Sequence, residues 1–184
     1  MNNKQMKLLI FGASGSGTTT LGREIEKQTG FKHLDVDDYY WKKTQPPFQE
    51  KIPLIDRNKS LLSDFEKHEN VLVSGSMVSW GKEWQTAFDL VIFIYLNNEV
   101  RIERLEKREF ERYGNKLLTD EKIKETSKDF IEWAKKYEDP NFDGRSLTIH
   151  NDWIKLLNCP VLRINGETEL QTKTERVISE IKNR

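Results

Sequence analysis

The sequence contains little cysteine, little proline and no net charge. Cys159 is the only cysteine in 184 residues, which excludes an internal disulfide and predicts a reducing, cytoplasmic location. Thirty basic and thirty acidic residues balance, which argues against a nucleic-acid or anionic-membrane partner. The longest apolar run, Leu90 to Leu96, is too short to span a bilayer. These features predict one soluble domain over residues 1–184, a monomer or weak dimer.

The most informative motif is a glycine-rich loop that follows the apolar run Lys7 to Phe11. Residues 12–19 read Gly-Ala-Ser-Gly-Ser-Gly-Thr-Thr, and an amphipathic segment comes next. Strand, glycine loop and helix are the setting of a P-loop, whose backbone N–H groups bind phosphate at a helix N-terminus. Thr18 stands where the motif has lysine, whereas Thr19 keeps the hydroxyl that binds Mg²⁺. A turn that binds no ligand and a dinucleotide-binding turn are the alternative interpretations.

Apolar runs alternate with amphipathic segments along the whole chain. Strands are expected at residues 7–11, 31–36, 71–73, 90–96 and 160–164, with helices after residue 20 and at about 54–68, 97–114, 120–137, 145–157 and 168–184. Thr168 and Gln171 predict a capping box that opens the last helix. The alternation predicts an α/β fold, a doubly wound five-stranded parallel sheet that binds ligands at the carboxyl ends of its strands.

Acidic residues follow the second expected strand. Asp35 and Asp37 alternate with Leu34 and Val36, so both carboxylates are predicted to share one face of that strand. Beside a P-loop, one carboxylate can hold Mg²⁺ and the other can orient or deprotonate an acceptor hydroxyl. A solvated turn is the alternative interpretation.

Arginines recur on the helix expected after the fourth strand. They are Arg101, Arg104, Arg108 and Arg112. At helical spacing they fall within an arc of roughly 80°. The stripe predicts that at least one guanidinium contacts phosphate, with ordinary ion pairs along an exposed helix as the alternative. Gly114 offers a hinge for a mobile lid.

Together with Ser74-Gly75-Ser76 after the third strand, these motifs resemble the P-loop nucleoside monophosphate kinase-like family. That family includes adenylate, shikimate and gluconate kinases and the bacterial DNA topology modulation proteins. Residues 33–41, His-Leu-Asp-Val-Asp-Asp-Tyr-Tyr-Trp, look most like the last of these and related adenylate kinase-like ATPases. The resemblance implies a P-loop fold of the nucleotide and shikimate kinase type, with a helical lid region at about residues 108–145.

The resemblance also implies roles for individual residues. ATP phosphates would bind at Gly12, Ser14, Gly15, Ser16, Gly17, Thr18, Thr19 and Thr20, and Mg²⁺ at Thr19 and Asp35. The acceptor would bind at Asp37, Ser74, Gly75 and Ser76. Asp37, Arg108, Arg112 and Arg145 would be catalytic, and Asn165-Gly166-Glu167 would line the adenine pocket.

The predicted function is that of a small-molecule kinase with ATP and Mg²⁺ as cofactors. It would transfer the γ-phosphate of ATP to an acceptor hydroxyl or phosphate. The lysine missing at Thr18 supports one alternative, a nucleotide-binding regulatory protein with slow turnover or none. Arg57 is the only arginine soon after the second strand, where adenylate kinases carry the arginines that bind the acceptor phosphate.

Overall fold

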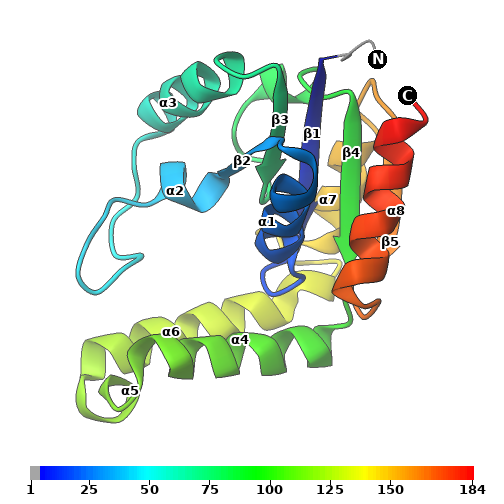
Figure 1. Ribbon diagram of the computed structural model, residues 1–184. Coiled ribbons are helices and arrows are strands. Elements are labelled where there is room, and N and C mark those ends of the chain that lie inside the picture. Colours follow the sequence, from blue (N-terminus) through cyan, green and yellow to red (C-terminus); the bar gives the residue numbers. More distant parts are fainter. Residues whose placement is uncertain (1–4) are drawn as a thin grey trace.

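A five-stranded parallel sheet forms the centre of the computed structural model, which describes residues 5–184 (Figure 1). The strands are β1 (Met6–Gly12), β2 (Lys32–Asp35), β3 (Asn70–Ser74), β4 (Leu90–Tyr95) and β5 (Val161–Asn165). Their order in the sheet is β2-β3-β1-β4-β5, and every pairing is parallel. The predicted α/β fold is confirmed.

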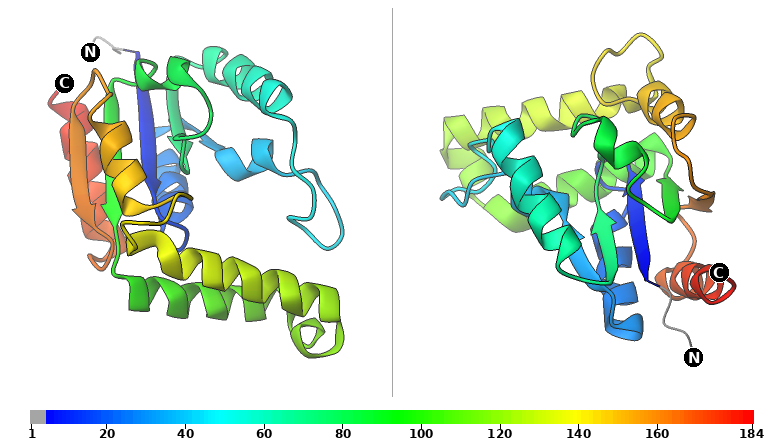
Figure 2. Two further views of the ribbon diagram at one scale, coloured as in Figure 1. Left: turned by 180° about the vertical axis from the view of Figure 1, so that it is seen from behind. Right: turned by 90° about the horizontal axis from the view of Figure 1, so that it is seen from above.

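Helices cover both faces of the sheet (Figures 1 and 2). One face packs against α1 (Thr18–Thr29) and α8 (Leu170–Lys182). The other packs against α3 (Leu54–Glu66), α7 (Leu147–Ile154) and the short 3-10 helix η1 (Lys82–Gln85). Among the described residues, no helix combines the length and the apolar character that crossing a membrane requires.

β1 shows how the sequence pattern builds the two layers. Its side chains alternate between the faces, as they must in a strand. Leu9 and Phe11 join the core on the side of α3 and α7, while Leu8 and Ile10 join the core on the side of α1 and α8. All four are fully buried, which is expected for the central strand of a parallel sheet.

A helical arm extends below the sheet (Figures 1 and 2). It consists of α4 (Asn98–Tyr113), α5 (Lys116–Thr119), α6 (Glu121–Lys135) and the 3-10 helix η2 (Lys136–Glu138). Leu105 packs against Ile131 and Ala134 and holds α4 to α6. The arm includes most of the predicted lid region, and it begins earlier, at Asn98.

The structure corrects two local predictions. The second strand ends at Asp35, because the Asp35 carboxylate accepts a hydrogen bond from the Asp37 N–H over 3.0 Å and caps the short helix α2 (Val36–Tyr40). Asp35 and Asp37 therefore do not share a strand face. The predicted capping box is also wrong, since α8 begins at Leu170 and its N-cap residue, Glu169, makes no side-chain hydrogen bond to the helix.

Any side chain at Gly75, directly after β3, is expected to destabilise the fold. Its φ angle is +113°, and a Cβ at this position would overlap the Val36 side chain. Gly30 ends α1 with a φ of +75° and has open space around its Cα. Gly75→Ala should lower the free energy of unfolding by about 2 to 4 kcal/mol, because strain and overlap add, and Gly30→Ala by only about 1 kcal/mol. Urea denaturation measures both, and equal losses would contradict the steric part of this prediction.

Candidate active site

The candidate site lies where β1, β2 and β3 end side by side. Ile10 of β1 pairs with Ser74 of β3, and Ser74 pairs in turn with Asp35 of β2. The Gly75 N–H donates to the Ile10 carbonyl oxygen over 2.9 Å and keeps this edge together. The loops that follow the three strands therefore start from one strip at the carboxyl edge of the sheet, which is where doubly wound folds bind ligands.

The glycine loop has the geometry of an anion cradle. Gly15 and Gly17 have φ angles of +84° and +95°, which other residues rarely adopt. A Cβ at Gly12 would collide with the Ile94 carbonyl oxygen, so only glycine fits there. No side chain caps the N-terminus of α1, whose first-turn N–H groups can therefore bind an anion. The Ser16 hydroxyl is buried without a hydrogen-bond partner, and these features together fit a phosphate group.

The threonines that follow the loop open α1. Thr18 and Thr19 are half-buried in the first turn, and Thr20 is exposed. Thr19 and Asp35 offer the hydroxyl and carboxylate oxygens that Mg²⁺ prefers. Because Asp35 uses its Oδ1 to cap α2, its other oxygen is the one available for a metal. The donor chemistry fits Mg²⁺, and the metal site stays a prediction.

Asp37 lies close to two arginines that are distant in the sequence. Desolvation raises the pKa of the Asp37 carboxyl and the charge of Asp35 raises it further, while Arg145 and then Arg108 act in the opposite direction. The residue is accessible to solvent, although protein surrounds its carboxyl at longer range. A carboxylate with a raised pKa beside two cations is suited to accept a proton from a hydroxyl group.

A further cation lies near Arg145. The Arg145 guanidinium is 5.6 Å from the centroid of the Trp133 ring, and burial lowers its pKa, with Arg57 contributing to the same direction. Arg57 itself is held between two rings, 4.3 Å from the centroid of Tyr40 and 4.9 Å from that of Trp80. The sequence indicated Arg57 only by its position after the second strand. The structure adds that the charge of Arg57 acts on Arg145.

The predicted arginine stripe divides into members with different surroundings. Arg101 is fully buried, and Arg104 is exposed. Arg108 is exposed, and it interacts electrostatically with Asp37. Arg112 forms an ion pair with Glu109 over 2.7 Å, and its charge helps to lower the pKa of Arg108 after desolvation. The catalytic role predicted for Arg112 stays a prediction.

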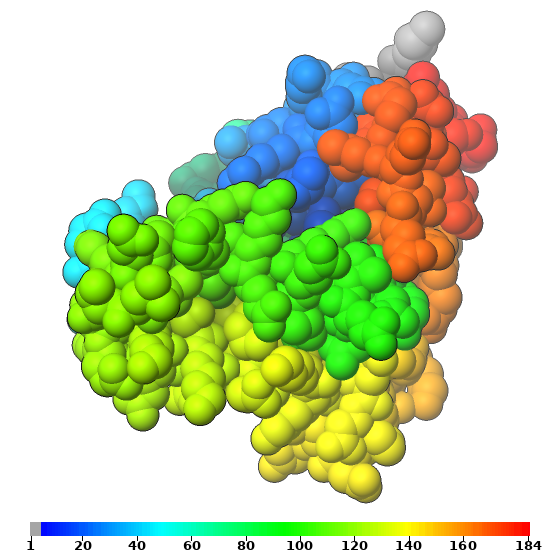
Figure 3. Space-filling view, turned by 90° about the horizontal axis from the view of Figure 1, so that it is seen from below, coloured from blue at the N-terminus to red at the C-terminus, as the bar shows by residue number. Residues whose placement is uncertain are grey.

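Arg112 also contacts the loop of residues 42–51, which follows α2. Its guanidinium carbon lies 4.4 Å from the centroid of the Phe48 ring, and the Tyr113 hydroxyl donates to the Pro47 carbonyl oxygen over 3.4 Å. In the space-filling view from below, cyan atoms of this part of the chain lie beside the green arm (Figure 3). The far end of α4 is thus joined to the segment that carries Asp37.

The hydroxyl groups of Ser74 and Ser76 are turned into the protein. Ser74 Oγ lies 2.8 Å from His33 Nε2, and Ser76 Oγ lies 2.9 Å from His150 Nε2. The other ring nitrogen of His150 lies 2.8 Å from the Tyr137 hydroxyl. Burial, together with the charge of Arg145, lowers the pKa of His150 to about 3, so this imidazole is neutral near pH 7. Because both hydroxyls are buried, the backbone around Gly75 is the part of this segment that an acceptor could contact.

The segment predicted to line an adenine pocket follows β5. The Gly166 N–H donates to the Tyr95 carbonyl oxygen over 2.6 Å, and the Gly166 carbonyl oxygen accepts from Lys173 Nζ over 3.0 Å. The Asn165 side chain accepts from the Glu167 N–H over 3.0 Å. The segment is therefore well ordered by its own hydrogen bonds, and its contact with adenine stays a prediction.

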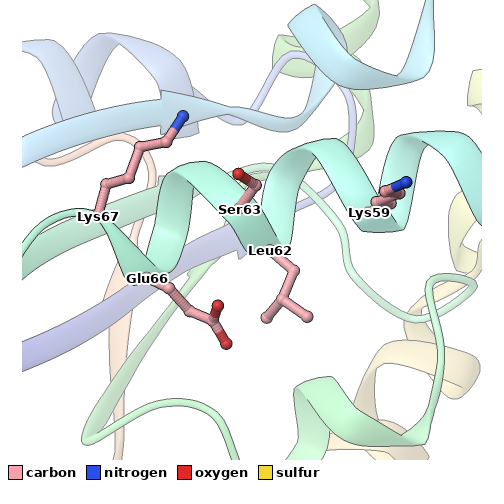
Figure 4. Close-up of a pocket in the computed structure, with 5 residues that line it drawn as sticks. All are labelled: Lys59, Leu62, Ser63, Glu66 and Lys67. Atoms are coloured by element: carbon pink, nitrogen blue, oxygen red, sulfur yellow. The ribbon is translucent and has the colours of Figure 1, made fainter.

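A hollow of about 450 Å³ lies on the outer side of α3 (Figure 4). It is lined by Lys59, Leu62, Ser63, Glu66 and Lys67. None of these residues belongs to the candidate site, so this hollow is separate from the chemistry described above.

Comparison with known proteins identifies the family. A sequence model of the AAA_18 family, described as an AAA domain, matches residues 8–129. The chain belongs to this family. It is 39% identical over 169 residues to the uncharacterized protein YqaC of Bacillus subtilis, covering 92% of this chain and 93% of that protein. It is 30% identical over 115 residues to a cytidylate kinase of Archaeoglobus fulgidus, covering 56% of this chain and 62% of that enzyme.

Solved structures confirm the P-loop kinase fold. A shikimate kinase from Bacteroides thetaiotaomicron aligns with a TM-score of 0.57 at 16% identity, covering 96% of this chain and 98% of that one. A deoxyadenosine kinase from M. mycoides aligns with a TM-score of 0.55 at 18% identity, covering 97% and 100%. The predicted membership of the P-loop nucleoside monophosphate kinase-like proteins is confirmed.

Removing the contact between Arg112 and Phe48 is expected to loosen the 42–51 loop. Phe48→Ala removes the ring, and Arg112→Met removes the guanidinium while keeping the length of the side chain. Either change should speed amide hydrogen exchange in residues 42–51 about fivefold, as the loss of ~1 kcal/mol predicts. Arg104→Met, on the same helix but exposed, is the control and should change nothing. Unaltered exchange in both variants would contradict the contact.

Proposed function

We propose that the protein transfers the γ-phosphate of ATP to a hydroxyl or phosphate group of a small molecule. The electrostatic interaction of Asp37 with Arg108 and Arg145, at the sheet edge that also carries the P-loop, supports this most strongly. Kinases among the relatives, the cytidylate kinase included, support the same class of reaction. The protein would act in the cytoplasm as a monomer or weak dimer.

The nucleotide would be held by the residues of the P-loop. Backbone N–H groups of residues 12–19 and the unpartnered hydroxyl of Ser16 would bind phosphate oxygens. Thr19 and Asp35 would hold Mg²⁺, which neutralises charge on the phosphates when it is bound. Thr18 contributes no charge, so other cations must stabilise the transferred group.

Asp37 would act on the acceptor. For a hydroxyl acceptor, a bond forms between its oxygen and the γ-phosphorus, the bond from that phosphorus to the bridging oxygen breaks, and ADP leaves. The hydroxyl proton moves to the Asp37 carboxylate. Arg108 and Arg145 would stabilise the negative charge of the phosphoryl group during transfer, the role that cations perform in this chemistry.

The charges around Asp37 favour an acceptor that carries an anionic group. Arg57 acts on Arg145 through space, and Arg145 in turn acts on Asp37. Like charges gathered at one place repel, and a phosphate or carboxylate on the acceptor would reduce that repulsion.

Thr18 supports a second candidate function, a nucleotide-binding regulatory protein. The P-loop geometry would be retained for binding, and turnover would be slow or absent without the lysine. Tight ATP binding with no transfer to any acceptor, and no effect of Asp37→Ala, would favour this candidate over the kinase.

Replacing Asp37 is expected to abolish transfer while leaving nucleotide binding intact. Asp37→Asn should lower kcat by about 10²- to 10⁴-fold, because the proton acceptor is lost. Asp38→Asn, which removes the neighbouring exposed carboxylate, is the matched control. ADP release is measured with nucleotides, sugars and hydroxy acids as acceptors, and EDTA should stop the reaction. Equal activity of the Asp37→Asn variant and the wild type would contradict the role of Asp37.

The raised pKa of Asp37 predicts the acid side of the pH profile. The carboxylate must be deprotonated to accept a proton, so kcat should rise with pH through a pKa above the usual value of about 3.9 for aspartate. Arg145→Met removes the cation that lowers this pKa most, so the rise should move to higher pH. A rise that moved to lower pH in this variant would contradict the assignment.

A further inference from the structure

Arg101 is a buried cation that makes no ion pair with any residue in the range 5–184. The residue is 0% exposed, and its guanidinium donates only to neutral oxygens. Nη1 donates to the Ser14 carbonyl over 3.1 Å, and Nη2 donates to Asn98 Oδ1 over 2.7 Å and to the Ala134 carbonyl over 3.2 Å. The guanidinium carbon lies 4.8 Å from the centroid of the Tyr137 ring, and Nε has no hydrogen-bond partner.

These contacts join three segments at the P-loop. Ser14 belongs to the glycine loop, Asn98 opens α4 and Ala134 lies near the end of α6. The backbone is close as well, since a Cβ at Gly15 would come within 3.1 Å of the Arg101 carbonyl oxygen. The position of the loop is therefore fixed directly by Arg101 and the start of the arm.

Stability alone does not account for a charge at this place. Burying a guanidinium without an acidic partner is costly, and an apolar side chain of similar length would avoid that cost. Arg101 also lies in the first turn of α4, where the helix dipole disfavours a cation. Burial lowers the pKa of Arg101 on balance, although the charge of Glu138 acts in the opposite direction. A positive charge kept under these conditions is explained by an anion that binds nearby.

We propose that Arg101 is a positioning residue that holds the P-loop and supplies part of the positive charge that lysine would supply at position 18. A guanidinium bonded to the Ser14 carbonyl acts, through the low dielectric of the interior, on phosphate bound to the N–H groups of the same loop. This inference rests on the proposed function, because it requires that the loop binds phosphate.

A double-mutant cycle between Arg101 and Thr18 tests the inference. Binding of pyrophosphate and of ATP, each with Mg²⁺, is measured by calorimetry for the wild type, Arg101→Met, Thr18→Lys and the double variant. Arg101→Met should weaken pyrophosphate binding at least about tenfold. Thr18→Lys should restore most of that loss, and it should improve the wild type far less. Arg176→Met, an exposed arginine of α8, is the control and should change binding less than twofold.

A structural role alone gives a different pattern. If Arg101 only tethers the loop, Thr18→Lys changes the affinity for pyrophosphate by the same factor in the wild type and in Arg101→Met. This result would overturn the inference. Normal pyrophosphate binding by Arg101→Met would overturn it as well. Arg101→Lys, which keeps the charge and loses the guanidinium fork, covers the case in which Arg101→Met does not fold. It should bind pyrophosphate within about threefold of the wild type even with a lower melting temperature, and a loss as large as that expected of Arg101→Met would count against the charge.

The same measurements separate this inference from the proposed function. Pyrophosphate binding that depends on Arg101, with no transfer of phosphate from ATP to any acceptor, would contradict the proposed function alone. A wild-type protein that binds neither pyrophosphate nor ATP would overturn both.

Discussion

The site depends on the pairing of β1 with β3 on one side and β4 on the other. Gly12 at the end of β1 pairs with Ile94, so closely that a Cβ at Gly12 has no room. On the other side, Ile10 pairs with Ser74. The glycine loop consequently leaves the sheet between the ends of two neighbouring strands. α4 begins at Asn98, only four residues after Ile94, and this short connection places its first turn against the loop.

Although the whole chain has no net charge, arginines are concentrated around the candidate site. Arg101 lies behind the glycine loop, while Arg57, Arg108 and Arg145 gather around the segment after β2. Glu109, Asp37 and Asp35 are among the acids that act on this group, and the charge of Asp35 also raises the pKa of Asp37. In a protein without net charge, this distribution provides a local positive field where the proposed phosphate transfer would need one.

The fold was predictable because its signals are local and periodic, whereas the site was predictable only in part. The apolar runs and the glycine loop each formed the expected element. Helix α2 was not predicted, because a single hydrogen bond from the Asp37 N–H to the Asp35 carboxylate turns the chain out of the strand. Hydrophobic periodicity does not distinguish conformations that differ by one such contact. Spacing on a helix likewise indicates that arginines share a side, but not what lies opposite each of them. Arg112 forms an ion pair with Glu109 and packs against the Phe48 ring of the 42–51 loop. Nothing in the sequence near Arg112 indicates that this loop lies against the end of α4.

Helix α4 connects the glycine loop to the 42–51 loop. Its first turn is bonded to the glycine loop through Arg101, and its last turn contacts the 42–51 loop through Arg112 and Tyr113. Arg108 lies between the two ends, about one turn before Arg112. A helix is stiff over this length, so a displacement at either end must move Arg108 relative to Asp37. The Arg108 charge therefore lies on a helix that is held at one end by the glycine loop and at the other by the 42–51 loop.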